Sequence, residues 1–309
     1  MIFFVGPPGV GKTSMSRLLA ESQNIKQRFH EIPVARGWTS VKDLIGFFNP
    51  LAGRFQAANT GLAGFFKDLH KEKEDSVDSA MAYVLLDEAN LSPIEHYWAT
   101  FMAMTDGEKT PFRIGEDDFS VPDCMRFLAT INYDGTTEPL SPRMIDRAPI
   151  ILMEESSMEG ECTVEESIAD ILPVSWNTME ELFGKKERHP SLNEGEKKAF
   201  DAVRYVLNKS DGPFGRPIQI SRRKEIAIQH FCERGRTLMN SENQLTALDY
   251  AIKQHVLPQV RGHGKPFKKR LDELSKVLSD YHLDNSYYIL DRMITYGTED
   301  LDSYDFFCW

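Results

Sequence analysis

The sequence predicts an α/β domain built on a parallel sheet, followed by an all-helical domain. Two observations carry this prediction. In the first half of the chain, short apolar runs alternate with helical patterns, which is typical of βαβ units. From residue 194 onward the pattern is helical almost to the end. We therefore expect an α/β domain at residues 1–153, an acidic linker with the start of the second domain at 154–193, and a helical domain at 194–309.

Five apolar runs are the expected strands of the first domain. Three of them are apolar through most of their length rather than alternating, as strands buried on both faces should be. The runs cover residues 2–5, 31–34, 82–86, 126–131 and 149–153.

The expected linker is rich in glutamate and poor in large apolar residues between 154 and 166. A charged surface connection explains this composition better than an acidic recognition motif, which stays open as the alternative. Five helices are then expected, at residues 194–207, 222–235, 242–257, 266–281 and 285–296. In the third, Leu245, Leu248, Ile252 and Val256 recur at spacings of three and four, so one face should meet a core.

Composition excludes several classes of protein. The 309 residues carry 36 Lys and Arg against 47 Asp and Glu, a net charge of −11, which gives no support for a general nucleic-acid surface. No apolar run approaches the ~18 residues of a membrane span, so we expect no membrane association. The four cysteines are too dispersed for a metal pair or a disulfide scaffold, and we expect reduced thiols in a cytoplasmic protein.

The first chemical motif lies between the first strand and the first helical run. It fits G-x-x-x-x-G-K-[ST], a loop whose backbone N–H groups converge on phosphate oxygens at a helix N-terminus. Lys12 should meet the β- and γ-phosphates, and Thr13 should bind Mg²⁺. The predicted nucleotide-binding residues here are Gly6, Pro7, Pro8, Gly9, Val10, Gly11, Lys12, Thr13 and Ser14.

Polar residues also end two later strands. Asp87 and Glu88 follow the apolar run at 82–86, where a carboxylate beside a phosphate loop can hold the metal and a second can polarise the attacking water. Asn132 ends the run at 126–131 and is placed to orient that water, although a turn-forming role in Asn-Tyr-Asp-Gly is the alternative. Arg143 and Arg147 follow; either is a candidate to stabilise transition-state charge in a neighbouring subunit, or forms a surface salt bridge.

This order of motifs resembles the AAA+ ATPases of the P-loop NTPase class. Within them it looks most like the modification-dependent restriction motors of the McrB type and their dynein-related, MoxR-like relatives. Residues 86–92, Leu-Asp-Glu-Ala-Asn-Leu-Ser, are similar to the acid-rich strand of that group and the residues after it. The segment at 38–46, followed by Asn-Pro at 49–50 and Gly-Arg-Phe at 53–55, resembles its region between the second and third strands.

The resemblance implies a ring, usually of six subunits, that binds ATP or GTP with Mg²⁺ between neighbours. It makes Arg147 the trans finger, with Arg143 as neighbour or substitute. It makes Arg222 the cis sensor arginine of a helical lid, with Arg223 as the alternative. Residues 48–60 resemble a hairpin that points at a central pore, or form an ordinary surface loop. The segment after Asn132 lacks the arginine of the GTP-using motors, so ATP is favoured.

The implied role is the motor subunit of a McrB-like restriction or defence complex, with a McrC-like nuclease as partner and DNA contacted through the partner or the pore. A MoxR-like, nucleotide-dependent scaffold that remodels protein partners is the alternative. A small-molecule P-loop kinase fits less well, because such kinases lack the long helical lid after an Asn-ended strand and paired arginines.

Overall fold

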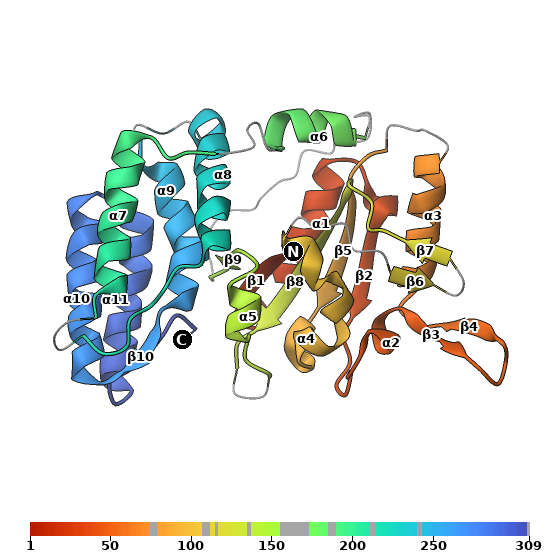
Figure 1. Cartoon of the computed structure of the whole chain (residues 1–309), viewed down its shortest axis with the longest axis horizontal. Helices are drawn as coiled ribbons and strands as arrows, with labels where there is room; N and C mark the ends of the chain where they lie inside the picture. The colour runs from red at the N-terminus through yellow and green to blue at the C-terminus, as the bar shows by residue number, and fades with distance from the viewer. Residues whose placement is uncertain are drawn as a thin grey trace. The chain divides into compact units, whose positions relative to one another are not determined.

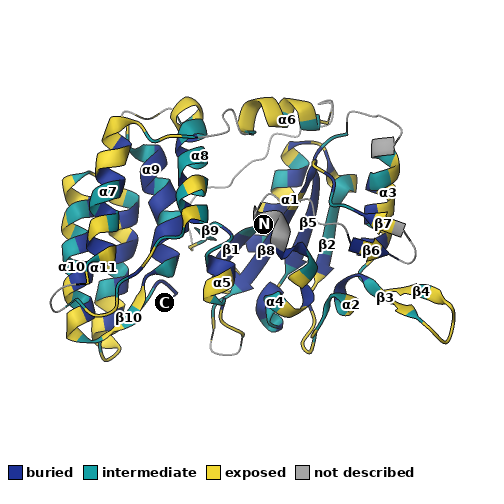
Figure 2. Ribbon diagram, viewed as in Figure 1, coloured by how far each residue is buried: buried dark blue, intermediate teal, exposed yellow. Residues whose placement is uncertain are grey.

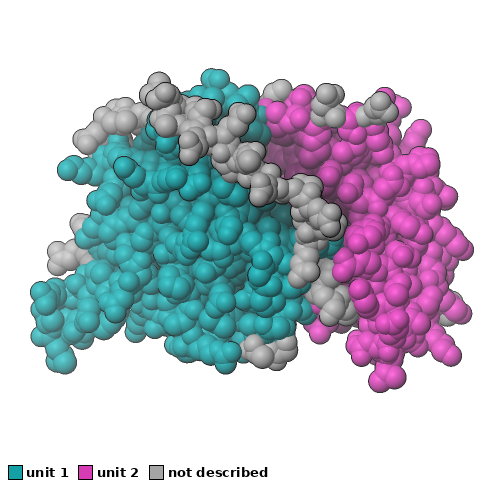
Figure 3. Space-filling view, turned by 180° about the vertical axis from the view of Figure 1, so that it is seen from behind, with its two compact units in different colours: residues 1–144, 151–184 teal, residues 145–150, 185–309 magenta. Residues whose placement is uncertain are grey.

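The structure is a computed structural model that describes residues 1–74, 79–106, 112–114, 117–134, 137–154, 173–184, 190–210, 214–239, 241 and 243–307. These residues form two compact units (Figure 3). Unit 1 comprises Met1–Met144 and Ile151–Gly184, and unit 2 comprises Ile145–Ile150 and Lys185–Trp309. The predicted domain boundaries after residues 153 and 193 stay a prediction. Most of the predicted acidic linker, residues 155–172, lies outside the described residues.

Unit 1 is built on a five-stranded sheet, as the sequence predicts (Figure 1). Its strand order is β2-β5-β8-β1-β9, with parallel pairing of β2 with β5, β5 with β8, and β8 with β1. The strands are β1 Ile2–Gly6, β2 Phe29–Pro33, β5 Ala82–Asp87, β8 Met125–Asn132 and β9 Ile150–Leu152. The five expected runs are therefore confirmed as strands of one sheet.

Both faces of this sheet are covered, which explains why the inner strands β1, β5 and β8 are largely apolar (Figure 2). On one face, Leu128 packs in a cluster with Phe4 and Ala20. On the other, the ring of Phe127 lies 5.5 Å from that of Trp98 and 5.3 Å from that of Phe101. Neighbouring residues of β8 thus enter opposite cores, as the two-residue period of a strand requires.

Short elements surround the sheet. The helices of unit 1 are α1 Lys12–Ser22, α2 Val41–Leu44, α3 Leu62–Glu74, α4 Ile94–Tyr97, α5 Pro142–Ile145 and α6 Trp176–Phe183, and 3-10 turns cover Lys26–Arg28, Ala89–Leu91 and Ala99–Asp106. Two antiparallel hairpins are β3 Gly46–Asn49 with β4 Arg54–Ala57, and β6 Phe112–Ile114 with β7 Asp117–Phe119. The β3–β4 hairpin extends away from the sheet (Figure 1).

Unit 2 is mainly helical. Its helices are α7 Glu194–Asn208, α8 Arg222–Leu238, α9 Thr246–Ala251, α10 Gly264–Asp280 and α11 Asp284–Glu299. A two-stranded antiparallel sheet pairs β10 Arg261–His263 with β11 Ser303–Asp305, on either side of α10 and α11 in the chain. The helix expected at 242–257 is one α-helix only in part. After α9 the chain forms a π-helical turn at Ile252–Val256 and a 3-10 turn at Leu257–Gln259, where Pro258 breaks the helical hydrogen bonding.

Among the described residues, no helix combines the length and the apolar character that crossing a membrane requires. The described cysteines Cys124 and Cys232 are free thiols and buried.

Candidate nucleotide-binding site

The glycine-rich loop joins β1 to α1 directly. Gly9 and Gly11 have φ of +88° and +85°, left-handed conformations that glycine adopts without a Cβ penalty. Gly11 is the N-cap of α1, so the loop ends where the free N–H groups of the helix begin. A helix N-terminus of this kind attracts phosphate oxygens, as the sequence predicts.

Lys12 is the first residue of α1 and is only 6% exposed. Its Nζ donates hydrogen bonds to the carbonyl oxygens of Gly6 at 2.9 Å and Pro7 at 2.6 Å. Burial lowers the pKa of this amine, and the nearby carboxylates of Asp87 and Glu88 partly oppose that shift. The ammonium is thus held inside the loop by neutral acceptors, so an anionic phosphate would be a better partner than those it has.

Gly6 is constrained by a distant segment. A Cβ built on Gly6 would overlap the carbonyl oxygen of Met153, just after β9. The N–H of Met153 donates to the carbonyl of Val5 at 2.8 Å, which fixes this close approach. Only glycine therefore fits where the loop leaves the sheet.

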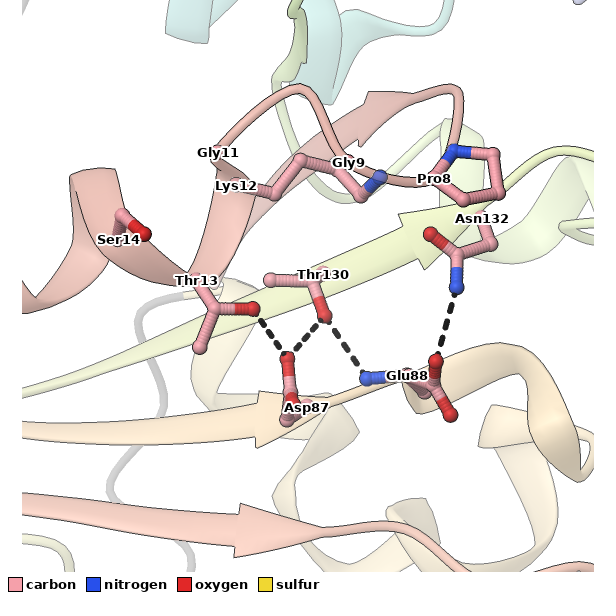
Figure 4. Close-up of a pocket in the computed structure, with 10 residues that line it drawn as sticks. All are labelled: Pro8, Gly9, Gly11, Lys12, Thr13, Ser14, Asp87, Glu88, Thr130 and Asn132. Carbon is pink, nitrogen blue, oxygen red and sulfur yellow. Dashed lines mark hydrogen bonds between the residues drawn. The ribbon is translucent and has the colours of Figure 1, made fainter.

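Asp87 ends β5 and faces the loop. Its Oδ1 accepts hydrogen bonds from the hydroxyls of Thr13, at 2.8 Å, and Thr130, at 2.7 Å (Figure 4). Thr13 lies 74 residues from Asp87, and their contact places the loop beside the end of β5.

Glu88 follows in an unusual backbone conformation. Its φ of 52° and ψ of 46° are left-handed, at a cost of roughly 1–2 kcal/mol for a non-glycine residue. The N–H of Glu88 donates to Thr130 Oγ1 at 2.8 Å, and its Oε1 accepts from Asn132 Nδ2 at 3.1 Å. Backbone strain of this kind concentrates at functional sites. The structure thus brings together Asp87, Glu88 and Asn132, which the sequence predicts separately.

Thr130 is the residue that sequence reasoning missed. Its one hydroxyl contacts both acidic residues: the oxygen accepts a hydrogen bond from the backbone N–H of Glu88, and the O–H donates one to the carboxylate of Asp87. A signal was present: Thr130 lies two residues before Asn132, and residues two apart in a strand share a face.

Asn90 anchors the loop that follows Asn132. Its side chain is buried, and its Nδ2 donates to the carbonyls of Asn132 at 2.8 Å and Glu138 at 3.0 Å. Ser92, two residues later, binds a different segment. Its Oγ donates to the carbonyl of Ala35 at 3.0 Å and accepts from the N–H of Trp38 at 3.1 Å. The segment at 86–92 therefore anchors the loops on either side of β5.

These groups line one pocket of about 280 Å³, formed entirely within unit 1 (Figure 4). Its lining residues are Pro8, Gly9, Gly11, Lys12, Thr13, Ser14, Asp87, Glu88, Thr130 and Asn132. Of the predicted loop residues, Gly6, Pro7 and Val10 do not line it, and the first two instead supply the carbonyls that bind Lys12.

The donor set suits Mg²⁺. Within the described parts of the chain, no three His, Cys, Asp or Glu side chains are grouped so as to hold a metal by themselves. Mg²⁺ is usually bound by one or two protein oxygens together with waters and substrate phosphates. The Thr13 hydroxyl and the Asp87 carboxylate, 2.8 Å apart beside the phosphate loop, are hard oxygen ligands that fit this pattern.

None of the predicted arginines is among the described residues that line this pocket. Arg143 is exposed in α5, in unit 1, and Arg147 is half-buried in the stretch 145–150 that belongs to unit 2. Arg222 begins α8 with its side chain 73% exposed and pairs with Glu225 at 3.1 Å. Arg223 pairs instead with Asp146 at 2.8 Å. The roles of these arginines stay predictions.

Comparisons with known proteins divide the chain in two. Residues 1–148 match the family model of the AAA domain of the dynein-related subfamily. Residues 170–301 match a family described as a domain of unknown function, DUF8727. No curated protein matches the chain. The first match covers the described strands β1 to β8 and all ten residues that line the pocket.

Proposed function

We propose, on the match of residues 1–148 to the AAA domain of the dynein-related subfamily, that the chain is an AAA+ NTPase. It hydrolyses ATP, with GTP as the alternative, at sites shared between the subunits of a ring. The single observation that carries the proposal is the pocket in which the buried Lys12 amine and the Glu88–Asn132 pair face the phosphate loop. Such an arrangement provides a phosphate-binding cation, a carboxylate and a water-orienting amide within one cavity.

Each of these residues then has a distinct role. Lys12 and the N–H groups of the loop bind the β- and γ-phosphates. Thr13 and Asp87 would hold Mg²⁺, whose positive charge would offset that of the phosphates. Glu88 polarises the attacking water. Asn132 orients it and, through its hydrogen bond, limits where the Glu88 carboxylate can lie.

The cations that complete the site come from beyond the pocket. In this proposal Arg147 reaches the nucleotide of the neighbouring subunit, with Arg143 as its neighbour or substitute. Arg222 contacts the nucleotide of its own subunit. Six subunits is the number that the family resemblance favours. The match to the dynein-related subfamily supports an assembly of this general type, since AAA domains typically act as oligomers.

For the biological role, we favour the motor subunit of a McrB-like restriction or defence complex in the cytoplasm. Its partner would be a McrC-like nuclease, and DNA would be contacted through that partner or the pore. The support is the segment at 86–92, which resembles this group of motors and in which Asn90 and Ser92 both bind neighbouring loops.

One observation favours the alternative, a MoxR-like scaffold that remodels protein partners. The β3–β4 hairpin exposes Phe47, Phe48 and Leu51, the last of them 98% exposed, and carries Arg54 as its one basic residue. Apolar side chains with so little positive charge suit contact with a polypeptide better than contact with a phosphate backbone.

Steady-state phosphate release from ATP and from GTP, measured across a range of protein concentrations, tests the proposal. We expect specific activity to rise with concentration, because neighbouring subunits complete each site, and to vanish in Glu88→Gln, which should still bind nucleotide. Release that is independent of concentration contradicts the shared site. Release that persists in Glu88→Gln contradicts the role of Glu88. Activation of turnover by unfolded polypeptide rather than by DNA would favour the scaffold.

A further inference from the structure

The first turn of α8 holds the residues on both sides of Arg147. Arg223 Nη1 donates to Asp146 Oδ2 at 2.8 Å, and Lys224 Nζ donates to the carbonyl oxygen of Ala148 at 2.8 Å. Asp146 and Ala148 are the immediate chain neighbours of Arg147. Their stretch, residues 145–150, belongs to the helical unit 2 although residues 1–144 and 151–184 belong to unit 1.

Lys224 is an unusual residue for this place. Its side chain is 1% exposed, and besides Ala148 it approaches Nδ1 of His255 at 3.4 Å. His255 is itself buried and lies in the π-helical turn Ile252–Val256. Burial lowers the pKa of Lys224 to about 7, with Asp146 opposing the shift, and burial also lowers the pKa of His255. An amine kept here against its desolvation cost, beside a π-helical turn, suggests a role beyond packing.

The first turn of α8, which makes both contacts, is itself fixed in place. The Ser221 hydroxyl caps α8 by accepting from the N–H of Lys224 at 3.2 Å, which fixes the first turn. Arg223 and Lys224 are consecutive, so any displacement of this turn is passed to Asp146 and Ala148 together. The backbone of Arg147 lies between these two fixed points and must follow.

We propose that Arg223 and Lys224 are positioning residues that set the orientation of Arg147, so that α8 of one subunit controls the finger which that subunit presents to its neighbour. This rests on the proposed function, in which Arg147 acts in trans on a nucleoside triphosphate. Neither α8 residue needs to touch that nucleotide. Their effect passes through the carboxylate of Asp146 and the carbonyl of Ala148.

A mixing experiment separates this role from a general structural one. The reference is Arg147→Ala mixed with Lys12→Ala. The first chain keeps an intact phosphate loop and the second keeps an intact finger, so mixed rings regain active sites if the finger acts in trans. Lys224→Met retains an unbranched side chain, one atom shorter, and removes the amine. Alone it should bind nucleotide normally and lose at least about tenfold in turnover.

The mixtures then decide where the defect lies. Lys224→Met mixed with Lys12→Ala should recover activity as the reference does, because the second chain supplies a correctly held finger. Lys224→Met mixed with Arg147→Ala should recover nothing, because both chains lack one. Lys268→Met is the matched control: that lysine pairs with Asp272 on α10, away from α8, and turnover should not change.

Asp146→Asn keeps the experiment decisive if Lys224→Met does not fold, because it weakens the contact of Arg223 at a half-buried site and should give the same pattern of recovery. Wild-type turnover in both variants overturns the proposal, as does recovery with Arg147→Ala or loss of nucleotide binding. If the reference pair recovers activity but Lys224→Met and Asp146→Asn do not when mixed with Lys12→Ala, the positioning role alone is refuted. If the reference pair fails while the wild type hydrolyses, the shared site is refuted and this role falls with it.

Discussion

Replacing Thr130 by valine should damage both the stability and the turnover of the protein. Valine keeps the shape of the side chain and removes a hydroxyl that makes hydrogen bonds of 2.7 Å to Asp87 and 2.8 Å to the N–H of Glu88. A hydrogen bond to a charged group contributes about 1.5–3 kcal/mol, and an N–H left without an acceptor costs about 1–3 kcal/mol. Since the site is only partly buried, we expect a loss near the lower end, about 2–3 kcal/mol.

Turnover should fall as well, because Thr130 holds the left-handed backbone of Glu88 in place. A displacement of a catalytic group by about 1 Å reduces rates by about 100-fold, so we expect a loss of roughly 10- to 100-fold in phosphate release. Urea unfolding followed by tryptophan fluorescence measures the stability term. Three of the four tryptophans, Trp38, Trp98 and Trp176, belong to unit 1, so this signal mainly reports the unit that contains the site.

Thr130→Ser is the matched control, because it retains the hydroxyl and loses only the methyl group. It should keep most of the turnover and stability. The reasoning is refuted if Thr130→Val unfolds within about 0.5 kcal/mol of the wild type and releases phosphate at the same rate. Equal damage from serine and valine would assign the effect to packing of the methyl group instead.

Three further results are expected. Gly6→Ala should lower the free energy of unfolding by at least about 1–3 kcal/mol, because its Cβ meets the carbonyl of Met153; an unchanged urea midpoint would contradict this. Between pH 7 and pH 10 the unfolded chain binds the proton that buried Lys224 has lost, so this residue should make stability rise with pH by at most about 1.4 kcal/mol per unit. The unfolding free energy of Lys224→Met should therefore rise less with pH over that range than that of the wild type. Identical slopes of unfolding free energy against pH in the two proteins would exclude this contribution of Lys224. Asn90→Leu should reduce phosphate release more than nucleotide affinity, because the loop after Asn132 loses its two anchoring bonds; equal loss in an equilibrium binding assay would show a wider defect.

Much of unit 1 was predictable because its signals are local. Strands β5 and β8 are apolar on both faces through most of their length, and Asp87, Glu88 and Asn132 could be identified from their position after these apolar runs. Thr130 shares a face of β8 with Asn132, but its role also depends on the register that places β5 beside β8, which the sequence does not specify.

Other features depend on contacts that no local pattern specifies. The association of residues 145–150 with unit 2 rests on Arg223 and Lys224, which are more than 70 residues away in the chain. The helical period over 242–257 correctly indicates a buried stripe, but the same period does not distinguish an α-helix from one that widens to a π-helical turn at Ile252.

The contact between Gly6 and Met153 limits how far the glycine-rich loop can be transferred to another protein by itself. Its eight residues are contiguous, yet the first of them is selected by a carbonyl group 147 positions later in the chain. A chimera that receives only the loop and its flanking helix would contain the phosphate-binding sequence but not the segment at Met153 that packs against Gly6, where the loop begins. The smallest unit that can be exchanged between related proteins is therefore the loop together with the edge strand β9 and the residue that follows it.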